Sequence, residues 1–199
     1  MPTTSTAASE RVPDEQTEDY RRLMASIRAS RRRKAGLVGR YADADCELGR
    51  RVFALAEGGV GAYLHGAPGR GKTYAAACAV RLALGSGMSA KLVTAADLLD
   101  AVKRGFDMGS DPLSHAERYG LLALDDLGAE SPTEWARETI VRLIDARTSR
   151  SLPTVVTSNH RLGEMRDMWG GAQGARIASR LGGACEIIEV SGDDMRRRR

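Results

Sequence analysis

The sequence predicts an α/β fold in which helices cover both faces of a parallel five-stranded sheet. Short apolar runs bounded by turn residues alternate with longer helical patterns, as expected of strand–helix–strand units. The run 120–124 is continuously apolar, which is typical of a strand buried on both faces. The 199 residues suffice for one domain with a self-sufficient core.

Hydrophobic periodicity and turn residues place the individual elements. Five strands are expected, at 61–65, 91–94, 120–124, 153–157 and 187–190. Helices are expected at 14–35, 44–57, 73–84, 95–103, 134–148 and 176–181, with a polar loop over 105–112. Thr94 is a candidate N-cap for the helix that follows it, and Ser131 or Thr133 for the helix from 134. Alanine side chains in the 73–84 helix would allow it to pack closely on the sheet.

The amino-terminal part is expected to form an extension, residues 1–43, ahead of a globular domain at 44–199. Residues 1–13 are rich in Thr, Ser and Ala and are predicted to be disordered. The next stretch carries an apolar stripe along one face of a helix, made of Tyr20, Leu23, Met24 and Ile27. Eight basic residues and no acidic one lie between Arg21 and Arg40, and residues 196–199 are all arginine. Such clusters indicate nucleic acid or an acidic partner, although solvated basic faces are equally common.

Composition excludes several other classes. No apolar run approaches the length of a membrane span, and residues 1–12 are too polar for a signal peptide. The three cysteines are odd in number and far apart, so they form neither a disulfide framework nor a zinc cluster. A reduced cytoplasmic location is therefore expected, with no membrane partner.

The residues Gly66–Thr73, GAPGRGKT, match the phosphate-binding loop G-x-x-x-x-G-K-[ST]. They lie between an expected strand and an expected helix, which is the setting this loop requires. Lys72 would reach the β- and γ-phosphates, and the Thr73 hydroxyl would ligate Mg²⁺. The expected nucleotide contacts are Gly66, Ala67, Pro68, Gly69, Arg70, Gly71, Lys72, Thr73 and Tyr74. The implied ligands are ATP and Mg²⁺.

Three further polar residues follow expected strands. Asp125 and Asp126 come directly after an apolar strand, at the edge where α/β sheets bind ligands. Asp125 would hold Mg²⁺ opposite Thr73, and Asp126 would orient or deprotonate the attacking water. A simple turn pair is the alternative for these two acids. Asn159 follows the fourth strand and would contact the γ-phosphate or the water, unless it only forms an Asx turn.

Arg180 lies on the last expected helix and would act on the nucleotide of a neighbouring subunit. Arg176, one helical turn earlier, competes for this role. A salt bridge within the same subunit is the alternative for either arginine.

Four stretches together resemble the AAA+ ATPases of the DnaC/DnaI/IstB type. They are GAYLHGAPGRGKT at 61–73, LLALDDLGAE at 121–130, LPTVVTSN at 152–159 and RIASRL at 176–181. The resemblance covers about residues 44–196 and implies an AAA+ core without a C-terminal helical lid. It assigns Lys72 and Thr73 to Walker A, and Asp125 and Asp126 to Walker B. Asn159 matches sensor 1, and Arg180 matches the arginine finger.

The resemblance also implies partners. Members of this group load the replicative hexameric helicase onto single-stranded DNA, or assist a transposase, and assemble head to tail. The element after the second strand faces the inside of such assemblies, which makes Lys103, Arg104 and Phe106 the expected DNA contacts. No Cys/His zinc module is present, so the helicase-binding element is expected within 14–35.

Three alternatives to a helicase loader remain open at this point. A transposase helper would have the same core. A small P-loop kinase would need several arginines in a lid, whereas 107–118 has only one. An adaptor that binds ATP but scarcely hydrolyses it is compatible with Asp126, because many AAA+ proteins have glutamate there. Slow, assembly-dependent hydrolysis is expected.

Overall fold

The computed structural model describes residues 18–128, 133–192 and 194, without the side chains of residues 106–108. Four expectations lie outside these ranges. They are the disorder of 1–13, the helix start at 14, the candidate N-cap Ser131 and the arginine cluster at 196–199. Within them no helix is both long and apolar enough to cross a lipid bilayer.

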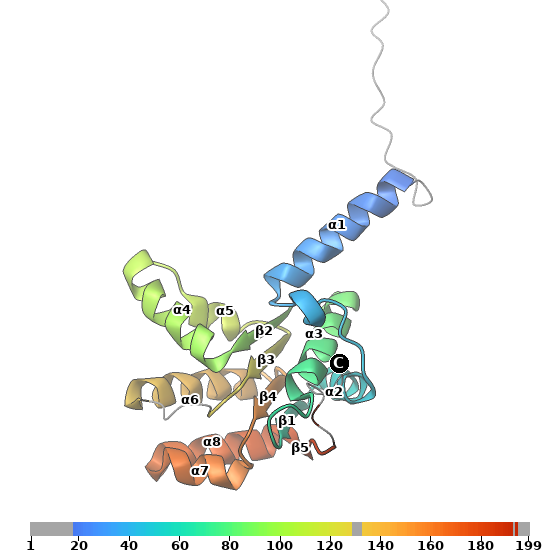
Figure 1. The fold of residues 1–199 in the computed structure, drawn as a ribbon. Coiled ribbons are helices and arrows are strands. Elements are labelled where there is room, and N and C mark those ends of the chain that lie inside the picture. The colour runs from blue at the N-terminus through green and yellow to red at the C-terminus, as the bar shows by residue number, and fades with distance from the viewer. Residues whose placement is uncertain (1–17, 129–132, 193, 195–199) are drawn as a thin grey trace, which may run out of the picture.

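Five parallel strands form one sheet at the centre of the molecule, as expected (Figure 1). The strands are β1 Gly61–His65, β2 Ala90–Thr94, β3 Leu121–Asp125, β4 Thr154–Ser158 and β5 Cys185–Glu189. Their order across the sheet is β2-β3-β4-β1-β5. The fourth strand in sequence therefore lies between the strand before the phosphate loop and the strand that ends in Asp125. All carboxyl ends lie at one edge, where ligands bind to sheets of this kind.

Helices cover both faces of the sheet. These helices are α2 Glu47–Glu57, α3 Lys72–Gly85, α4 Ala95–Met108, α5 Pro112–Ala116, α6 Glu134–Ser149, α7 Leu162–Trp169 and α8 Gly171–Ala184. Ahead of them come α1 Glu18–Lys34 and a 3-10 turn, η1, at Gly39–Tyr41.

Alternate strand residues pack on opposite layers. Leu64 and Ala123 lie in the core shared with α2 and α3, whereas Tyr63, Leu124 and Val156 lie in the core shared with α4 to α8. The alanines of α3 are buried against the sheet, as expected.

Four helices differ clearly from the expectation: α4 and α8 are longer, and α5 and α7 were not predicted. The helix after β2 continues to Met108, so the loop expected at 105–112 is largely wrong, and α5 begins at Pro112. Gly105, the first residue of the expected loop, is buried within α4, and a Cβ there would lie 2.7 Å from Cδ of Pro112. Close packing therefore outweighs the roughly 1 kcal/mol helix penalty of glycine.

The other two differences follow β4. The chain forms α7, which the sequence did not predict because eight residues give too few turns for a clear period. The final helix, α8, spans 14 residues instead of six, since burial of Ile177 and Leu181 offsets its several glycines.

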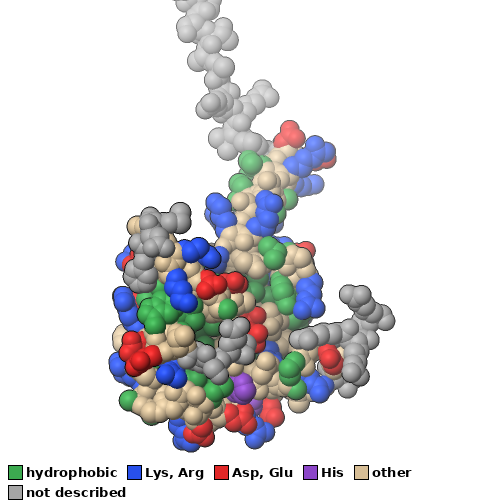
Figure 2. All heavy atoms as spheres, turned by 60° about the vertical axis from the view of Figure 1, so that its left-hand side comes forward, with side chains coloured by type: hydrophobic (Ala, Val, Ile, Leu, Met, Phe, Trp, Pro, Cys, Tyr) green, Lys and Arg blue, Asp and Glu red, His purple; other side chains and the backbone are tan. Residues whose placement is uncertain are grey.

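The helix α1 projects from the body and has no buried residue among its side chains (Figure 1). Leu23 is 52 % exposed, and basic side chains lie around the helix (Figure 2). The residues just after it anchor it. Ala35 and Leu37 are buried in the core, and the backbone N–H of Leu92 in β2 donates to Ala35 O at 2.8 Å.

Arg147 of α6 is a fully buried cation that joins three elements. Its guanidinium donates to Ala116 O, Tyr119 O, Pro153 O and Thr154 Oγ1 at 2.7–2.9 Å. Burial lowers the pKa of Arg147 to about 10, and the nearby Arg150 adds to this effect. The side chain stays charged at neutral pH, stabilised by the carbonyl dipoles it contacts.

We expect Arg147→Met to lower the free energy of unfolding by about 3 kcal/mol or more, because it leaves several buried carbonyls without a donor. Urea denaturation would measure the change. Arg142→Met is the matched control on the same helix: Arg142 is 71 % exposed and should change stability by less than about 0.5 kcal/mol. A small effect of Arg147→Met would contradict a structural role for this cation.

Candidate nucleotide site

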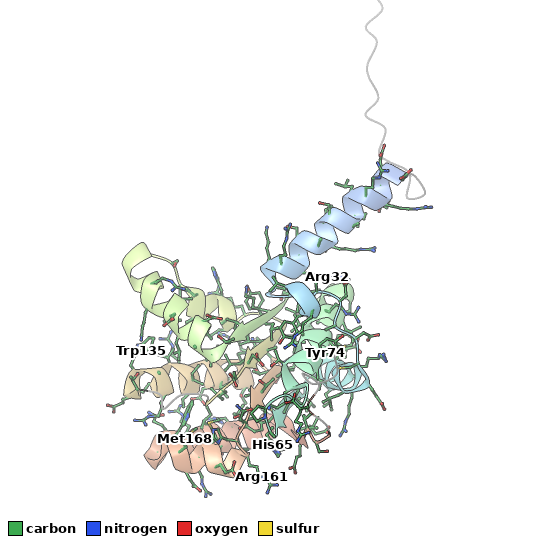
Figure 3. The ribbon with its side chains drawn as sticks, in the orientation of Figure 1. Arg32, His65, Tyr74, Trp135, Arg161 and Met168 are labelled. Atoms are coloured by element: carbon green, nitrogen blue, oxygen red, sulfur yellow. The ribbon has the colours of Figure 1, made fainter. Side chains whose placement is uncertain are left out.

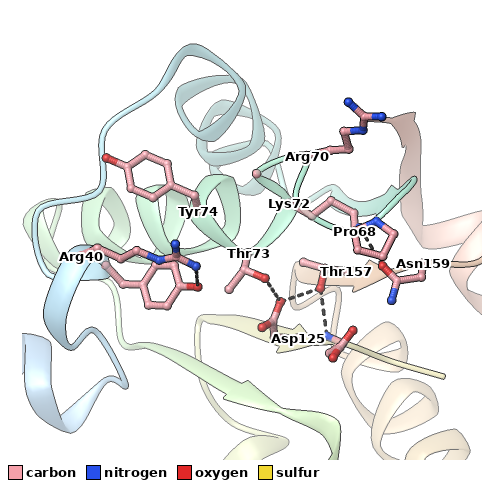
Figure 4. Close-up of a pocket in the computed structure, with 13 residues that line it drawn as sticks. Arg40, Pro68, Arg70, Lys72, Thr73, Tyr74, Asp125, Thr157 and Asn159 are labelled. Carbon is pink, nitrogen blue, oxygen red and sulfur yellow. Dashed lines mark hydrogen bonds between the residues drawn. The ribbon is translucent and has the colours of Figure 1, made fainter. Parts of the chain in front are cut away.

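The loop between β1 and α3 borders a cavity of about 440 Å³ at the carboxyl edge of the sheet (Figure 4). Its lining includes residues from four separate segments of the chain, namely Arg40, Tyr41, Pro68, Gly69, Arg70, Gly71, Lys72, Thr73, Tyr74, Asp125, Asp126, Thr157 and Asn159. Gly71, which caps α3, has a φ of 87°, a left-handed conformation that favours glycine. The first N–H groups of a helix lack intrahelical acceptors, so the start of α3 suits an anion.

The Lys72 ammonium joins this loop to the end of β4. Its Nζ donates to Gly66 O at 2.6 Å and to Ala67 O at 3.0 Å. It also donates to Asn159 Oδ1 at 2.9 Å. The sequence predicted both side chains for the site, and the structure brings them together although they are 87 residues apart. The positive charge is therefore held at the mouth of the loop.

A chain of hydrogen bonds organises the two acids. The hydroxyls of Thr73 and Thr157 both donate to Asp125 Oδ1, at 2.9 Å and 2.6 Å. The backbone N–H of Asp126 donates to Thr157 Oγ1 at 2.9 Å. The loop helix, β3 and β4 are thus linked through one carboxylate (Figure 4).

Asp125 is only 8 % exposed, and burial raises the pKa of its carboxyl. The nearby Asp126 raises this pKa further, whereas the hydrogen bonds from Thr157 and Thr73 and the charge of Lys72 lower it. A buried carboxylate beside a threonine hydroxyl is a hard oxygen donor pair of the kind Mg²⁺ prefers. No group of three or more His, Cys, Asp or Glu side chains gathers in the described ranges. One protein carboxylate suits Mg²⁺, which usually takes its remaining ligands from water and phosphate.

Asp126 differs from Asp125 in both exposure and backbone. Its side chain is exposed at the cavity, and its φ is 58°, a left-handed conformation that is uncommon for a residue other than glycine. Such strain persists only where surrounding contacts impose it, and here the N–H bond to Thr157 does so. The backbone thus turns Asp126 toward the cavity while Asp125 stays buried.

Several cavity residues were not predicted. Thr157 was expected only as part of a polar strand end, because its bonds to β3 are visible only once the strands are paired. Arg40 and Tyr41 belong to η1, outside the motifs. Arg40 lies 5.0 Å over the Tyr41 ring and donates to its hydroxyl at 2.9 Å. The only available signal was a tyrosine beside an arginine.

The structure does not bring Arg180 into this cavity. Arg180 Nε donates to Asp145 Oδ1 of α6 at 2.8 Å, and Arg176 forms a salt bridge with the other oxygen of the same carboxylate. Both arginines therefore make the bond within one chain that was considered as the alternative. Both remain at least half exposed.

The expected DNA contacts lie on α4, beside a second cavity. Lys103 and Arg104 are exposed, and Lys103 Nζ lies 5.1 Å from the centroid of the Trp135 ring. Only the backbone of Phe106 is described. The second cavity, also about 440 Å³, has Lys103, Trp135 and Trp169 among its lining residues, and Asp126 borders both cavities. Figure 3 shows Trp135 between α4 and α6. No motif or spacing in the sequence pairs these tryptophans with Lys103.

Relatives of known name share this architecture. The replicative helicase loader DnaC of Escherichia coli (strain K12) is 29 % identical over 127 residues, which are 62 % of this chain and 51 % of DnaC. The replicative helicase loader DnaI of Bacillus subtilis (strain 168) is 30 % identical over 111 residues, covering 54 % of this chain and 36 % of DnaI. The match therefore spans about half the length of DnaC and a smaller share, 36 %, of the length of DnaI.

A crystal structure of DnaI superposes with a TM-score of 0.64 and 26 % identity, covering 82 % of this chain and 99 % of that one. The sequence profile of the IstB-like ATP binding proteins matches residues 56–199, which include the phosphate loop, both acids and Asn159. The chain belongs to this family of ATP-binding proteins, with the AAA+ type of P-loop fold.

Proposed function

We propose that this protein hydrolyses ATP and uses the nucleotide cycle to load a replicative helicase onto single-stranded DNA. The observation that carries the proposal is the meeting of Lys72, Asp125 and Asn159 at one cavity, from three different strand ends. The names of DnaC and DnaI, both replicative helicase loaders, support the choice of process.

ATP would bind with its phosphates on the loop and its base toward η1. Lys72 would neutralise the β- and γ-phosphates, and the start of α3 would supply backbone N–H donors. Tyr41 and Tyr74 line the same cavity and provide apolar surface away from the phosphates. Asp45 N–H donates to the Tyr74 hydroxyl at 3.3 Å, which restrains that ring.

Mg²⁺ fits the donor pair of Thr73 and Asp125, whose oxygens lie 2.9 Å apart. When bound, the ion would neutralise charge on the β- and γ-phosphate oxygens. Thr157 is assigned a supporting role, because its hydroxyl donates to Asp125 Oδ1 and so lowers the pKa of that carboxyl against the effect of burial.

Asp126 and Asn159 are assigned to the attacking water. Oxygen of this water attacks the γ-phosphorus while the bond from that phosphorus to the bridging oxygen of ADP breaks. Asp126 orients the water and accepts its proton, and Asn159 contacts the water or the γ-phosphate. The products are ADP and inorganic phosphate. The short side chain of Asp126 reaches less far than glutamate would, so slow turnover is expected.

Arg180 would supply positive charge to the nucleotide of the next copy in a head-to-tail oligomer. Two features support action on another subunit. Arg180 does not line the cavity of its own chain, and its side chain is half exposed on α8. The extension, residues 1–43, would bind the helicase through α1, whose basic and apolar side chains are left uncovered by the body.

Single-stranded DNA would contact α4. The ammonium of Lys103 and the guanidinium of Arg104 would meet phosphates, and Phe106 completes the expected set. The ring of Trp135 under Lys103 adds a stacking surface for a base.

Assistance to a transposase is the second candidate, favoured by the IstB-like family to which the chain belongs. Affinity purification of the tagged protein from its native cell separates the two. Recovery of a hexameric helicase supports loading, whereas recovery of a transposase supports the alternative.

Lys72→Ala should weaken ATP binding on the order of 100-fold, because a largely buried charge facing the phosphates is lost. Asp126→Asn should leave affinity nearly unchanged but lower phosphate release about 10²- to 10⁴-fold, since its role arises at the attacking water. Titration with a fluorescent ATP analogue and a phosphate-release assay would measure both. Lys91→Ala, a lysine on β2 away from the cavity, is the control. Equal loss of binding and turnover in Asp126→Asn would contradict its assigned role.

Thr157→Val should shift the acid limb of the turnover profile to higher pH. The Thr157 hydroxyl lowers the pKa of Asp125, so its loss raises that pKa, and Asp125 must be deprotonated to hold Mg²⁺. A pH profile of phosphate release at fixed Mg²⁺ would reveal the shift. Thr139→Val is the matched control, because that buried hydroxyl donates to Trp135 O inside α6. If the acid limb is unchanged in Thr157→Val, ionisation of Asp125 does not limit turnover and its assigned role is wrong.

Changing Lys103 and Arg104 together to Ala should reduce the slope of log affinity for single-stranded DNA against log salt by about one to two units, at roughly 0.7 per phosphate contact. Fluorescence anisotropy with a labelled oligonucleotide would measure the slope, and ATP binding should stay the same. The control is the adjacent exposed pair Arg50 and Arg51 on α2, which removes the same charge from the other face of the sheet. Deleting residues 1–35 should instead cost helicase binding. Loss of DNA binding only in that deletion would reverse the assignment of the two surfaces.

A further inference from the structure

One carboxylate on α6 binds two arginines of α8. Asp145 Oδ1 accepts from Arg180 Nε at 2.8 Å, and Asp145 Oδ2 forms a salt bridge with Arg176 Nη2. The two arginines are four residues apart and so lie one above the other on the same face of α8. Because each guanidinium uses a different oxygen, either arginine can leave without breaking the other bond.

The exposures of the three side chains are unequal. Asp145 is 17 % exposed, whereas Arg176 and Arg180 are 57 % and 50 % exposed. A carboxylate that is mostly withdrawn from water is costly to leave without a positive partner. The arginines, in contrast, can exchange this carboxylate for another anion at the surface. Asp145 therefore needs one arginine at all times, but it does not need both.

Neither arginine lines the nucleotide cavity of its own chain. If Arg180 acts on a γ-phosphate, as proposed above, the phosphate belongs to another copy, and Arg180 must first leave Asp145. A second cation that remains on Asp145 would lower the free energy needed for this step.

We infer that Asp145 is a positioning residue that releases Arg180 to the neighbouring subunit while Arg176 remains as its counter-charge. This inference rests on the proposed function of Arg180. It assigns Arg176 a role different from that of a second finger: Arg176 makes the departure of Arg180 possible. It also predicts that removing Arg176 retains Arg180 on Asp145, and that neutralising Asp145 as well reverses this effect.

Mixing two proteins tests the inference. The acceptor is Arg180→Ala, which keeps an intact phosphate loop but lacks the finger. The donor is Lys72→Ala, which supplies Arg180 but does not turn over ATP. Phosphate release at a fixed acceptor concentration is measured against donor concentration, and gives a half-maximal concentration and a maximal rate.

Further changes are then made in the donor alone. Adding Arg176→Gln should raise the half-maximal donor concentration about tenfold, with the maximal rate unchanged, because Arg180 is held more firmly on Asp145. Adding Asp145→Asn to that donor should return the concentration to the starting value or below it. Arg176→Lys is the matched control, since it keeps the charge and should change the concentration less than threefold.

Other outcomes would overturn the inference. If Asp145→Asn does not rescue the Arg176→Gln donor, Arg176 only stabilises the packing of α6 on α8. If Arg176→Gln abolishes the maximal rate with or without Asp145→Asn, Arg176 is itself the finger. Failure of the unmodified Lys72→Ala donor at every ratio would refute the proposed role of Arg180 first. Thermal melting of each donor checks folding, and the comparison of Gln with Lys at 176 stands even if both lower the melting temperature.

Discussion

The buried carboxylate of Asp125 is the point on which the nucleotide site depends. It accepts hydrogen bonds from Thr73 at the start of α3 and from Thr157 at the end of β4, so one helix start and two strand ends meet at one carboxylate. The strand order makes this possible, because β4 lies between β1 and β3. A different order would separate Thr157 from Asp125 and Asn159 from Lys72. The geometry of the cavity therefore depends on the pairing of the strands as well as on the phosphate-loop motif.

This arrangement has an energetic cost. Burial raises the pKa of Asp125, so its ionised form at neutral pH destabilises the folded protein relative to an exposed carboxylate. Asp126 adds backbone strain at a φ of 58°. Neither feature improves packing. Both place charge and lone pairs where a phosphate and its cation would offset the cost, and local cost of this kind is typical of functional sites.

The sequence predicted the features that depend on neighbouring residues, namely the strands and the phosphate loop. It missed the side-chain contacts between elements that are far apart in the chain. The strands were found because buried apolar runs are visible in the sequence, and the loop because GAPGRGKT matches a known motif between an expected strand and an expected helix. Lys72 and Asn159 were both predicted for the site, but their contact depends on β4 lying beside β1. In contrast, α7 was missed because its buried residues, Met165 and Trp169, make only one helical repeat. The pairings of Thr157 with Asp125 and of Asp145 with two arginines cross between elements, so no local period reveals them.

The segment between α1 and α2 connects the projecting helix α1 to the nucleotide cavity, although the sequence predicted an extension, 1–43, and a globular domain, 44–199, as separate parts. Ala35 and Leu37 are buried in the core, and four residues beyond Leu37 the ring of Tyr41 lines the nucleotide cavity. A salt bridge between Arg32 of α1 and Asp43 spans the turn η1. The end of α1 is therefore anchored to the body close to the nucleotide cavity, by buried residues and a salt bridge. A base bound beside η1 would therefore lie next to the segment that fixes α1 to the body.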